Sequence, residues 1–434
     1  MPELWTNWAG QQHCAPEVVE KPADEQQLIE AVVGAASRGL TVRVAGSGHS
    51  FTDAVCTDGC LIDLSGMGRV LDVDPEQRLV TIEAGIVIHD LAEELATHGL
   101  ALENQGDIDV QSLAGAISTA THGTGERFGN LGSRVESVRV ITAAGQALDL
   151  DAASDHDGLL AARASVGALG VISRITIQTV PAFTIHRIDE PKPLAEALGR
   201  LDELVARNDH FELFAFPHAD QCLTYSSRRT DEPPEPRSRW RAYVDDELVT
   251  NKGLGLLMRA GRARPSATPA IGRLLGRLVS RSEHKDASHR VYAHERKVRF
   301  TEMEYAIPRE HAREALERVL QMIRRRQVQV AFPIELRFAA PDDALLSTAN
   351  GRDTAYIAVH QLIGMEFESY FRGVEAIMDE YDGRPHWGKR HYQSAATLAP
   401  RYPGWERFQA VRKRLDPDGV FSNDYVDRVL GPTT

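Results

Sequence analysis

Three loops rich in glycine and small hydroxyl residues restrict the fold of this sequence more than any other feature. They fall at residues 45–50, 111–125 and 165–177, and apolar runs typical of strands or helices flank them. Glycine lets backbone N–H groups approach an anion closely, and serine adds donors. Glycines also end helices, so one such loop alone is weak evidence for an anion-binding site. Together they indicate an anion-binding region, but they fit neither the G-x-G-x-x-G nor the P-loop pattern.

The periodicity of apolar residues divides the chain into two regions. Up to residue 180, predicted helices alternate with predicted strands: helices over 22–40 and 87–100, strands over 42–44, 78–85 and 138–150. After residue 181, strands over 210–217, 328–339 and 354–363 mix with helices over 309–326 and 371–381. This mixture predicts a second α+β domain built on an antiparallel sheet.

Composition excludes several classes of protein. The 434 residues carry a formal net charge of −13, which argues against a nucleic-acid partner. The N-terminus lacks the features of a secretory signal, and the longest apolar stretch, 159–172, is too short to span a bilayer. Four cysteines do not form a disulfide framework, and no second pair completes a metal site with Cys56 and Cys60. We therefore expect a cytoplasmic protein without a structural metal.

One segment departs from the acidic balance of the chain. Residues 255–300 contain eleven Arg and Lys against three Asp and Glu. Within this segment, residues 269–281 place leucine, isoleucine and valine on one helical face and arginines around the other. Two interpretations stay open: a surface helix that packs on the second domain, or an interfacial helix that lies on a membrane.

An opposite-charge pair marks the second region. Glu335 and Arg337 are two residues apart in the predicted strand 328–339, so their side chains point to the same face. Because the strand is otherwise apolar, the pair predicts a polar site on a covered face. The alternative is a solvated strand face.

The order of several motifs resembles a known flavoprotein group. "VRVAGSGHSF", "LENQGDIDVQSLAGAISTATHGTG" and "GALGVISRITI" resemble the FAD-binding domain of the vanillyl-alcohol oxidase superfamily. "GRPHWGKRHY" (383–392) and "LDPDGVFSNDY" (415–425) resemble the endings of the aldonolactone oxidoreductases, and most closely those of bacterial L-gulono-1,4-lactone dehydrogenases. The resemblance covers nearly the whole chain. It implies an α+β flavoprotein with an FAD-binding domain (1–180), an antiparallel-sheet cap domain (181–395) and a C-terminal segment (396–434) that packs back on the first domain.

The resemblance also implies where FAD binds. The pyrophosphate would lie between the loops at 46–50 and 112–123, with the adenine near residues 170–172. The expected cofactor-binding residues are Gly46, Ser47, Gly48, His49, Ser50, Gly106, Asp107, Ser112, Gly115, Ala116, Thr119, His122, Gly170 and Ile172. His49 would carry a covalent bond to the flavin C8-methyl group, or else hydrogen-bond within the loop. Residues 105–112 contain no cysteine, so a second link is excluded.

The same resemblance implies the reacting residues. Glu335 would bind substrate hydroxyls, and Arg337 and Lys389 would stabilise negative charge on the alkoxide or the reduced flavin. His360 matches an active-site position more loosely and is nearly as well explained as a core histidine. His386 and His391 would support the Lys389 loop. Whether Lys389, Arg337 or a coupled pair receives the hydroxyl proton stays open.

The implied reaction is oxidation of the C2 hydroxyl of an aldono-1,4-lactone, with L-gulono-1,4-lactone giving an ascorbate-type enediol. Alditol oxidase and D-arabinono-1,4-lactone oxidase are alternatives on the same scaffold. A third alternative is an FAD-binding subunit of a membrane-bound assembly, without sugar chemistry. The acceptor would be oxygen or cytochrome c. Glycine at position 106 leaves space for oxygen at the flavin, which favours oxygen as acceptor. The nearest resemblance is to dehydrogenases, which favours an external acceptor such as cytochrome c.

Overall fold

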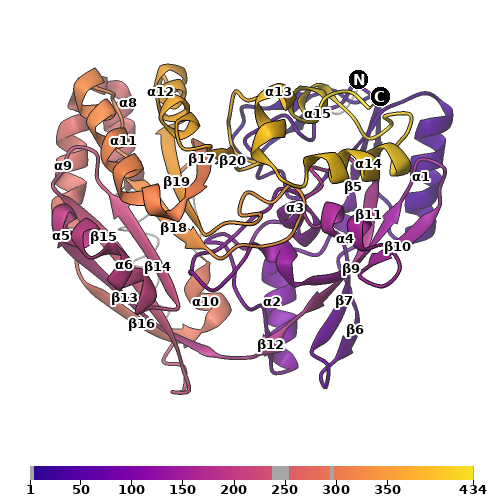
Figure 1. The fold of residues 1–434 in the computed structure, drawn as a ribbon, viewed down its shortest axis with the longest axis horizontal. Coiled ribbons are helices and arrows are strands. Elements are labelled where there is room, and N and C mark those ends of the chain that lie inside the picture. The colour runs from indigo at the N-terminus through magenta and orange to yellow at the C-terminus, as the bar shows by residue number, and fades with distance from the viewer. Residues whose placement is uncertain (1–3, 237–253, 294–297, 434) are drawn as a thin grey trace.

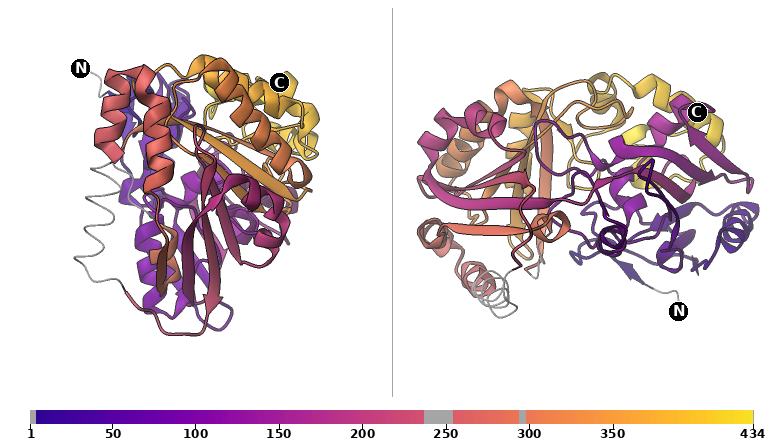
Figure 2. Two further views of the ribbon diagram at one scale, coloured as in Figure 1. Left: turned by 90° about the vertical axis from the view of Figure 1, so that its left-hand side faces the viewer. Right: turned by 90° about the horizontal axis from the view of Figure 1, so that it is seen from below.

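The computed structural model describes residues 4–236, 254–293 and 298–433. They form two lobes (Figure 1). Viewed from below (Figure 2, right), one lobe contains the indigo and purple N-terminal residues with the yellow C-terminal helices, and the other contains the magenta-to-orange middle of the chain. Both chain ends lie in the first lobe.

The first lobe is built on two sheets. A parallel sheet has the order β3-β5-β4, and an antiparallel sheet has the order β10-β9-β11-β7-β6. Their strands are β3 (Val18–Glu20), β4 (Val42–Ala45), β5 (Cys60–Asp63), β6 (Val70–Asp74), β7 (Leu79–Glu83), β9 (Val135–Ile141), β10 (Ala147–Asp151) and β11 (Val171–Gln178). The short pairs β1 (Trp5–Thr6) with β2 (His13–Cys14), and β8 (Leu100–Ala101) with β12 (Val180–Pro181), complete the strands of this lobe.

The helices of the N-terminal part that accompany these sheets include α1 (Glu25–Ser37), α2 (Ile88–Thr97), α3 (Leu113–Ser118) and α4 (His156–Ala162). The helix predicted over 22–40 is confirmed as α1. Its first turn is capped by Asp24, whose side chain accepts the Gln27 N–H. The helix ends before Gly39, which adopts a φ of 71° that favours glycine.

The second lobe is built on one antiparallel sheet. Among the described residues it has eight strands in the order β16-β13-β15-β14-β18-β19-β17-β20. They are β13 (Thr184–Pro193), β14 (His210–Ala215), β15 (Gln221–Thr230), β16 (Ser282–Ala287), β17 (Phe300–Pro308), β18 (Ile334–Ala339), β19 (Thr354–Leu362) and β20 (Arg384–Pro385). The helices are α5 (Leu194–Gly199), α6 (Leu201–Ala206), α8 (Leu254–Ala263), α9 (Thr268–Leu278), α10 (Ser288–Tyr292), α11 (Ala312–Arg326) and α12 (Glu368–Asp379).

Two strand predictions were too long. Residues 138–150 belong to two antiparallel strands, since β9 ends at Ile141 and β10 begins at Ala147. Residues 328–339 were expected to form a single strand, but β18 begins only at Ile334. Pro333 precedes it, and proline has no N–H to donate to a ladder.

The two faces of this sheet differ in chemistry. Alternate residues, including Leu213, Leu336 and Ile357, join a core with apolar side chains of α5, α6, α11 and α12. The residues between them point to the opposite face and include many charged side chains. Tyr356 on that face stacks on His122 of the first lobe at a centroid distance of 3.5 Å. The polar face of the sheet is therefore turned toward the first lobe.

The C-terminal helices are α13 (Ala395–Leu398), α14 (Trp405–Leu415) and α15 (Asp424–Leu430). Their apolar side chains join the core of the first lobe. Leu346 and Trp387, from within the range predicted for the cap domain (181–395), join it too. Because the chain crosses between the lobes in this way, the division at residues 180 and 395 stays a proposal.

Candidate functional site

The three glycine-rich loops meet around one cavity of the first lobe. Its volume is about 910 Å³, counted to its open mouth. The predicted cofactor-binding residues on its wall are Gly46, Ser47, Gly48, His49, Ser50, Ser112, Gly115, Thr119, Gly170 and Ile172. Segments separated by more than 100 residues are thus brought to one cavity. The structure adds Arg43, Gln111 and Gly167 to the wall.

The wall of this cavity requires glycine at particular points. A Cβ atom at Gly46 would lie 2.2 Å from Ser112 Oγ, and one at Gly170 would lie 2.4 Å from Val140 Cγ1. Gly170 also adopts a φ of +136°. Among the described residues, the buried Gln111 Oε1 has no hydrogen-bond partner. A close-fitting wall with an unsatisfied polar atom suits a ligand with polar groups, and FAD fits this description.

Two side chains hold the loops together, and sequence reasoning missed both. The buried Arg43 guanidinium donates to the carbonyl oxygens of Ala54, Val166, Gly167 and Phe421. Burial, reinforced by the charge of Arg412, lowers the pKa of Arg43 to about 10. The one signal in the sequence was an arginine between two valines of a strand.

Asn423 performs a similar task at the other end of the chain. Its side-chain amide donates to the carbonyl oxygens of Asp53, Ala54 and Cys56, at distances of 2.8–3.2 Å. The C-terminal segment therefore fixes the loop that follows His49.

A larger cavity lies between the lobes. It measures about 2230 Å³ and shares His49, Ser50, Gln111 and Thr119 with the first cavity. All four predicted reacting residues line it: Glu335, Arg337, His360 and Lys389. Asp107 is on its wall too, and its apolar lining includes Phe214, Phe216, Leu223, Phe300 and Phe332. Residues from the beginning and the end of the chain thus meet at one site.

His49 lies where the two cavities join. Its ring stacks on Trp8, with a centroid distance of 5.3 Å and an interplanar angle of 24°. The Phe51 N–H donates to the Gly388 carbonyl over 2.7 Å, which ties the His49 loop to the Lys389 loop. Burial, aided by the charge of Lys389, lowers the pKa of His49 to about 4. The imidazole is therefore neutral at neutral pH.

Arg337 is surrounded by carboxylates. It forms an ion pair with Glu335, and its Nη2 lies 3.4 Å from Asp107 Oδ2 and 3.6 Å from Glu212 Oε2. Burial alone would lower the pKa of Arg337, but Glu212, Glu335 and Asp107 raise it well above the ordinary value. Glu335 and Arg337 share the inward face of β18, as the two-residue spacing predicted.

Lys389 faces two carboxylates that the sequence analysis did not identify. Glu302 pairs with Lys389, and Glu304 Oε2 lies 3.8 Å from Lys389 Nζ. Both are on β17, where Glu302 is opposite His360 in the register and Glu304 is opposite Ala358. Glutamates at alternate positions of an otherwise apolar strand were the signal that could have revealed them.

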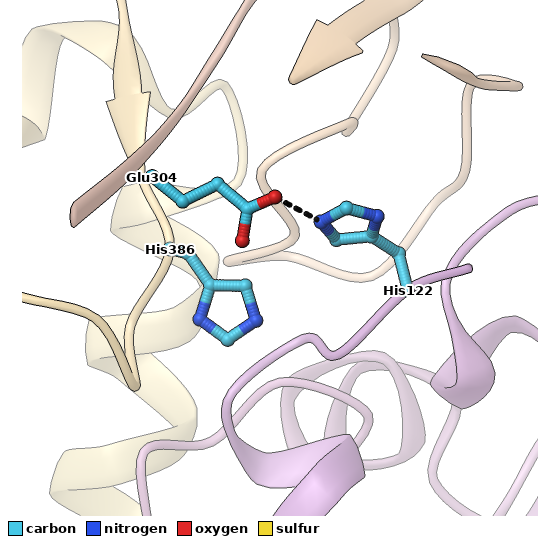
Figure 3. Close-up of side chains that lie close together, drawn as sticks. All are labelled: His122, Glu304 and His386. Carbon is cyan, nitrogen blue, oxygen red and sulfur yellow. Dashed lines mark ion pairs between the residues drawn. The ribbon is translucent and has the colours of Figure 1, made fainter. Parts of the chain in front are cut away.

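His122, Glu304 and His386 form a compact buried cluster (Figure 3). Their candidate ligand atoms lie within 4.8 Å of one another. His122 Nε2 is 3.3 Å from Glu304 Oε1, and His386 Nδ1 accepts the Gly388 N–H over 3.0 Å. With Nδ1 accepting, Nε2 of His386 carries the proton, and Glu304 already faces the charge of Lys389 at 3.8 Å. These contacts favour an ion pair over a metal centre.

Three of the predicted cofactor-binding residues are not on the wall of either cavity. Gly106, Ala116 and His122 are buried behind it. His122 instead pairs with Glu304 and stacks on Tyr356, so its contacts connect the two lobes. The sequence placed it correctly in the loop but did not reveal which way its side chain points.

His386 and His391 lie in positions that support the Lys389 loop. The Lys389 N–H donates to the His386 carbonyl, and His391 Nε2 lies 3.0 Å from the Tyr425 hydroxyl. Tyr425 in turn donates to the Trp387 carbonyl over 2.6 Å.

The basic segment 255–300 forms α8, α9, β16 and α10 and the beginning of β17, with residues 294–297 outside the described ranges. Ile271 of α9 joins the second core, and a Cβ at Gly276 would lie 2.9 Å from that of Ala219, so this helix packs on the lobe. Leu274 and Leu278 are 43% and 62% exposed. In the described part of the chain, each helix is too short or too polar to cross a bilayer.

The paired cavities, with polar glycine loops in one and fixed cations in the other, define an FAD-dependent oxidoreductase. Residues 16–151 match the FAD binding domain, and residues 175–429 match the D-arabinono-1,4-lactone oxidase family. The chain belongs to this aldonolactone-oxidising family within the vanillyl-alcohol oxidase superfamily, and the resemblance drawn from the motifs is confirmed.

The chain is similar to several curated proteins along its whole length. It is 57% identical over 432 residues to an L-gulono-1,4-lactone dehydrogenase of Mycobacterium tuberculosis, covering 100% of both chains. It is 34% identical to an L-gulonolactone oxidase of Bos taurus, covering 98% of this chain and 97% of that protein. Its fold is similar to that of a cholesterol oxidase from Brevibacterium sterolicum, with a TM-score of 0.80 at 18% identity, over 99% and 97% of the two chains.

Proposed function

We propose that this protein oxidises the C2 hydroxyl of an aldono-1,4-lactone, with L-gulono-1,4-lactone as substrate and the ascorbate-type enediol as the final product. The observation that carries this proposal is the convergence of Glu335, Arg337 and Lys389 on a cavity that opens beside His49. The full-length similarity to an L-gulono-1,4-lactone dehydrogenase supports the substrate class.

The residues of the larger cavity have distinct tasks in this reaction. When bound, FAD supplies the acceptor for the hydride that leaves C2. Glu335 accepts hydrogen bonds from substrate hydroxyls and orients the lactone ring. Arg337 and Lys389 stabilise the negative charge that develops as the hydroxyl proton leaves. The aromatic side chains of the wall exclude water from the reacting atoms.

The test is anaerobic mixing of the yellow protein with a panel of lactones and polyols. L-Gulono-1,4-lactone is expected to bleach the flavin absorbance fastest. The alternatives are an alditol oxidase, since a Streptomyces alditol oxidase is 32% identical over 98% of both chains, and a D-arabinono-1,4-lactone oxidase. Faster bleaching by xylitol or by D-arabinono-1,4-lactone would favour one of them, and the absence of bleaching by every compound would reject the proposal.

His49 is proposed to be covalently linked to the flavin. The neutral imidazole at the junction of the cavities, held by Trp8, supports this link, because an unprotonated ring nitrogen is a competent nucleophile. A covalent bond would keep the cofactor bound and raise its reduction potential.

Gly106, which lies behind the cavity wall next to the lining residue Asp107, is proposed to control reaction with oxygen relative to reaction with an external acceptor such as cytochrome c. A methyl group at this position would lie 3.5 Å from the His122 carbonyl oxygen and 3.7 Å from Thr121 Cγ2, which are ordinary contact distances. Gly106→Ala should therefore fold normally. Its turnover with oxygen is expected to fall relative to turnover with cytochrome c, measured in parallel steady-state assays. An unchanged ratio would remove Gly106 from this role.

Helix α9 is proposed to contact anionic membranes peripherally. The exposed Leu274 and Leu278 lie next to Arg273 and Arg277, a combination typical of interfacial helices. Flotation with vesicles containing phosphatidylglycerol tests this contact, and equal recovery of the wild type and of Leu278→Ser would reject it.

A further inference from the structure

A buried carboxylate, that of Glu302, joins two of the basic groups of the reacting site, His360 and Lys389. Glu302 is 5% exposed, and its two oxygens face different partners. Oε1 lies 3.3 Å from His360 Nε2, and Oε2 pairs with Lys389 Nζ. Both partners line the larger cavity, as does Glu302 itself. The arrangement follows from the register of β17 and β19, which sets Glu302 opposite His360.

The contacts of Lys389 prevent it from acting as a base. Burial would lower the pKa of Lys389, but the charges of Glu302 and Glu304 outweigh burial and raise it above the ordinary value. A lysine that keeps its proton stabilises negative charge but cannot receive a further proton. Arg337, with a pKa raised well above the ordinary value, is excluded for the same reason.

His360 offers a basic atom of another kind on the wall of this cavity. Its Nε2 faces the Glu302 carboxylate, so the ring proton belongs on that nitrogen. In the part of the chain that the structure describes, its buried Nδ1 has no hydrogen-bond partner. A buried acceptor without a partner is unfavourable, so a hydrogen bond from a ligand hydroxyl to this atom would be stabilising. The rings of Phe300 and Phe332 pack around His360, with centroid distances of 5.0 and 6.0 Å, and fix its orientation.

We propose that Glu302 is a positioning residue that holds His360 with its proton on Nε2, so that Nδ1 accepts the proton of the substrate hydroxyl. The step balances: the C2–H electron pair leaves as hydride to the flavin oxidant, the O–H proton goes to Nδ1, and C2=O forms. Glu302 then faces the imidazolium that results. This inference rests on the proposed function and assigns the proton acceptor that the sequence left open.

The charged and titratable groups around this dyad come from two other elements and from β17 itself. They are Glu304 on β17, Glu335 and Arg337 on β18, and His386 and Lys389 in the loop after β20. Glu304 differs from Glu302 in its contacts, because it faces His122 and Lys389 and not His360. It therefore provides a matched control on the same strand.

The first measurement is the tautomer of His360 in the wild-type holoenzyme. Two-bond ¹H–¹⁵N correlation spectra of protein labelled with ¹⁵N-histidine distinguish protonated Nδ1 from protonated Nε2, and the His360→Asn variant assigns the signal. We expect the Nε2–H form in the wild type and in Glu304→Gln, and a mixture of tautomers in Glu302→Gln. A wild-type signal from Nδ1–H would overturn the proposal, whether or not any lactone is oxidised.

The second measurement is the pH dependence of kcat/KM for the best substrate of the panel. Glu302→Gln is expected to lower kcat/KM by about 10²-fold, the usual contribution of a positioned base. His360→Asn should also lose the limb on which kcat/KM rises with pH. If that limb and the rate persist in His360→Asn, His360 is not the base and the proposal fails. Failure of the proposed function would instead appear as a wild-type flavin that no lactone reduces.

Discussion

Replacement of Arg337 by lysine is expected to lower the rate constant of flavin reduction by about 10²–10³-fold, the usual effect of removing one preorganised donor from a developing negative charge. The arginine side chain lies among Glu335, Asp107 and Glu212 at once. Lysine supplies one compact charge at the end of a flexible stem and cannot keep that set of contacts. The charge would be retained while its position is lost.

Anaerobic stopped-flow absorbance of the flavin measures this effect directly. Arg313→Lys is the matched control, because Arg313 is an exposed arginine of α11 paired only with Glu317 among the interactions described. It should reduce its flavin at the wild-type rate. A rate for Arg337→Lys within a factor of about three of the wild type, which corresponds to under 1 kcal/mol, would show that geometry at this position is unimportant.

The second large effect is expected from replacement of His49, which lies where the two cavities join. His49→Ala should abolish covalent attachment, so that acid denaturation releases all the flavin into the supernatant, whereas the wild type retains it in the protein pellet. The physical reason is the position of His49 on the walls of both cavities, with its ring held against Trp8. His156→Ala, at an exposed histidine of α4, serves as control and should keep its flavin.

The lowered pKa of His49 sets the pH dependence of this attachment. Because burial holds that pKa near 4, below the ordinary value, the ring loses its nucleophilic lone pair only as the pH falls toward 4. The extent of attachment, measured by in-gel flavin fluorescence after reconstitution, should therefore be the same at pH 6 and pH 8. A steep decline between these values, or release of all flavin from the wild type, would contradict the proposed link.

Much of the site followed from local sequence. The glycines of residues 46–50 and 112–115 indicated a close-fitting anion site, because backbone approach of this kind needs positions without a Cβ atom. The two-residue spacing of Glu335 and Arg337 placed both on one face, because side chains alternate along a strand. The motif around Lys389 placed a cation near them only through resemblance to a family.

Other contacts could not be read from the sequence. Arg43 donates to carbonyl groups up to 378 residues away, and Glu302 meets His360 across a strand pair. His122 lies in a predicted cofactor loop but turns toward Glu304 instead. In each case the residue type could be read from the sequence, but the sequence did not indicate which distant residue the side chain would contact.

The sequence by itself determined the α+β class, the glycine loops and the strand that carries Glu335 and Arg337, because turns and side-chain alternation depend on residues close together in the chain. Only the tertiary structure decided that Lys389 is held as a cation, that His360 Nδ1 has no hydrogen-bond partner among the described residues, and that the C-terminal segment secures the loop after His49. Those properties depend on strand register and packing between distant segments, and the charge of a buried group is set by the neighbours that folding brings to it.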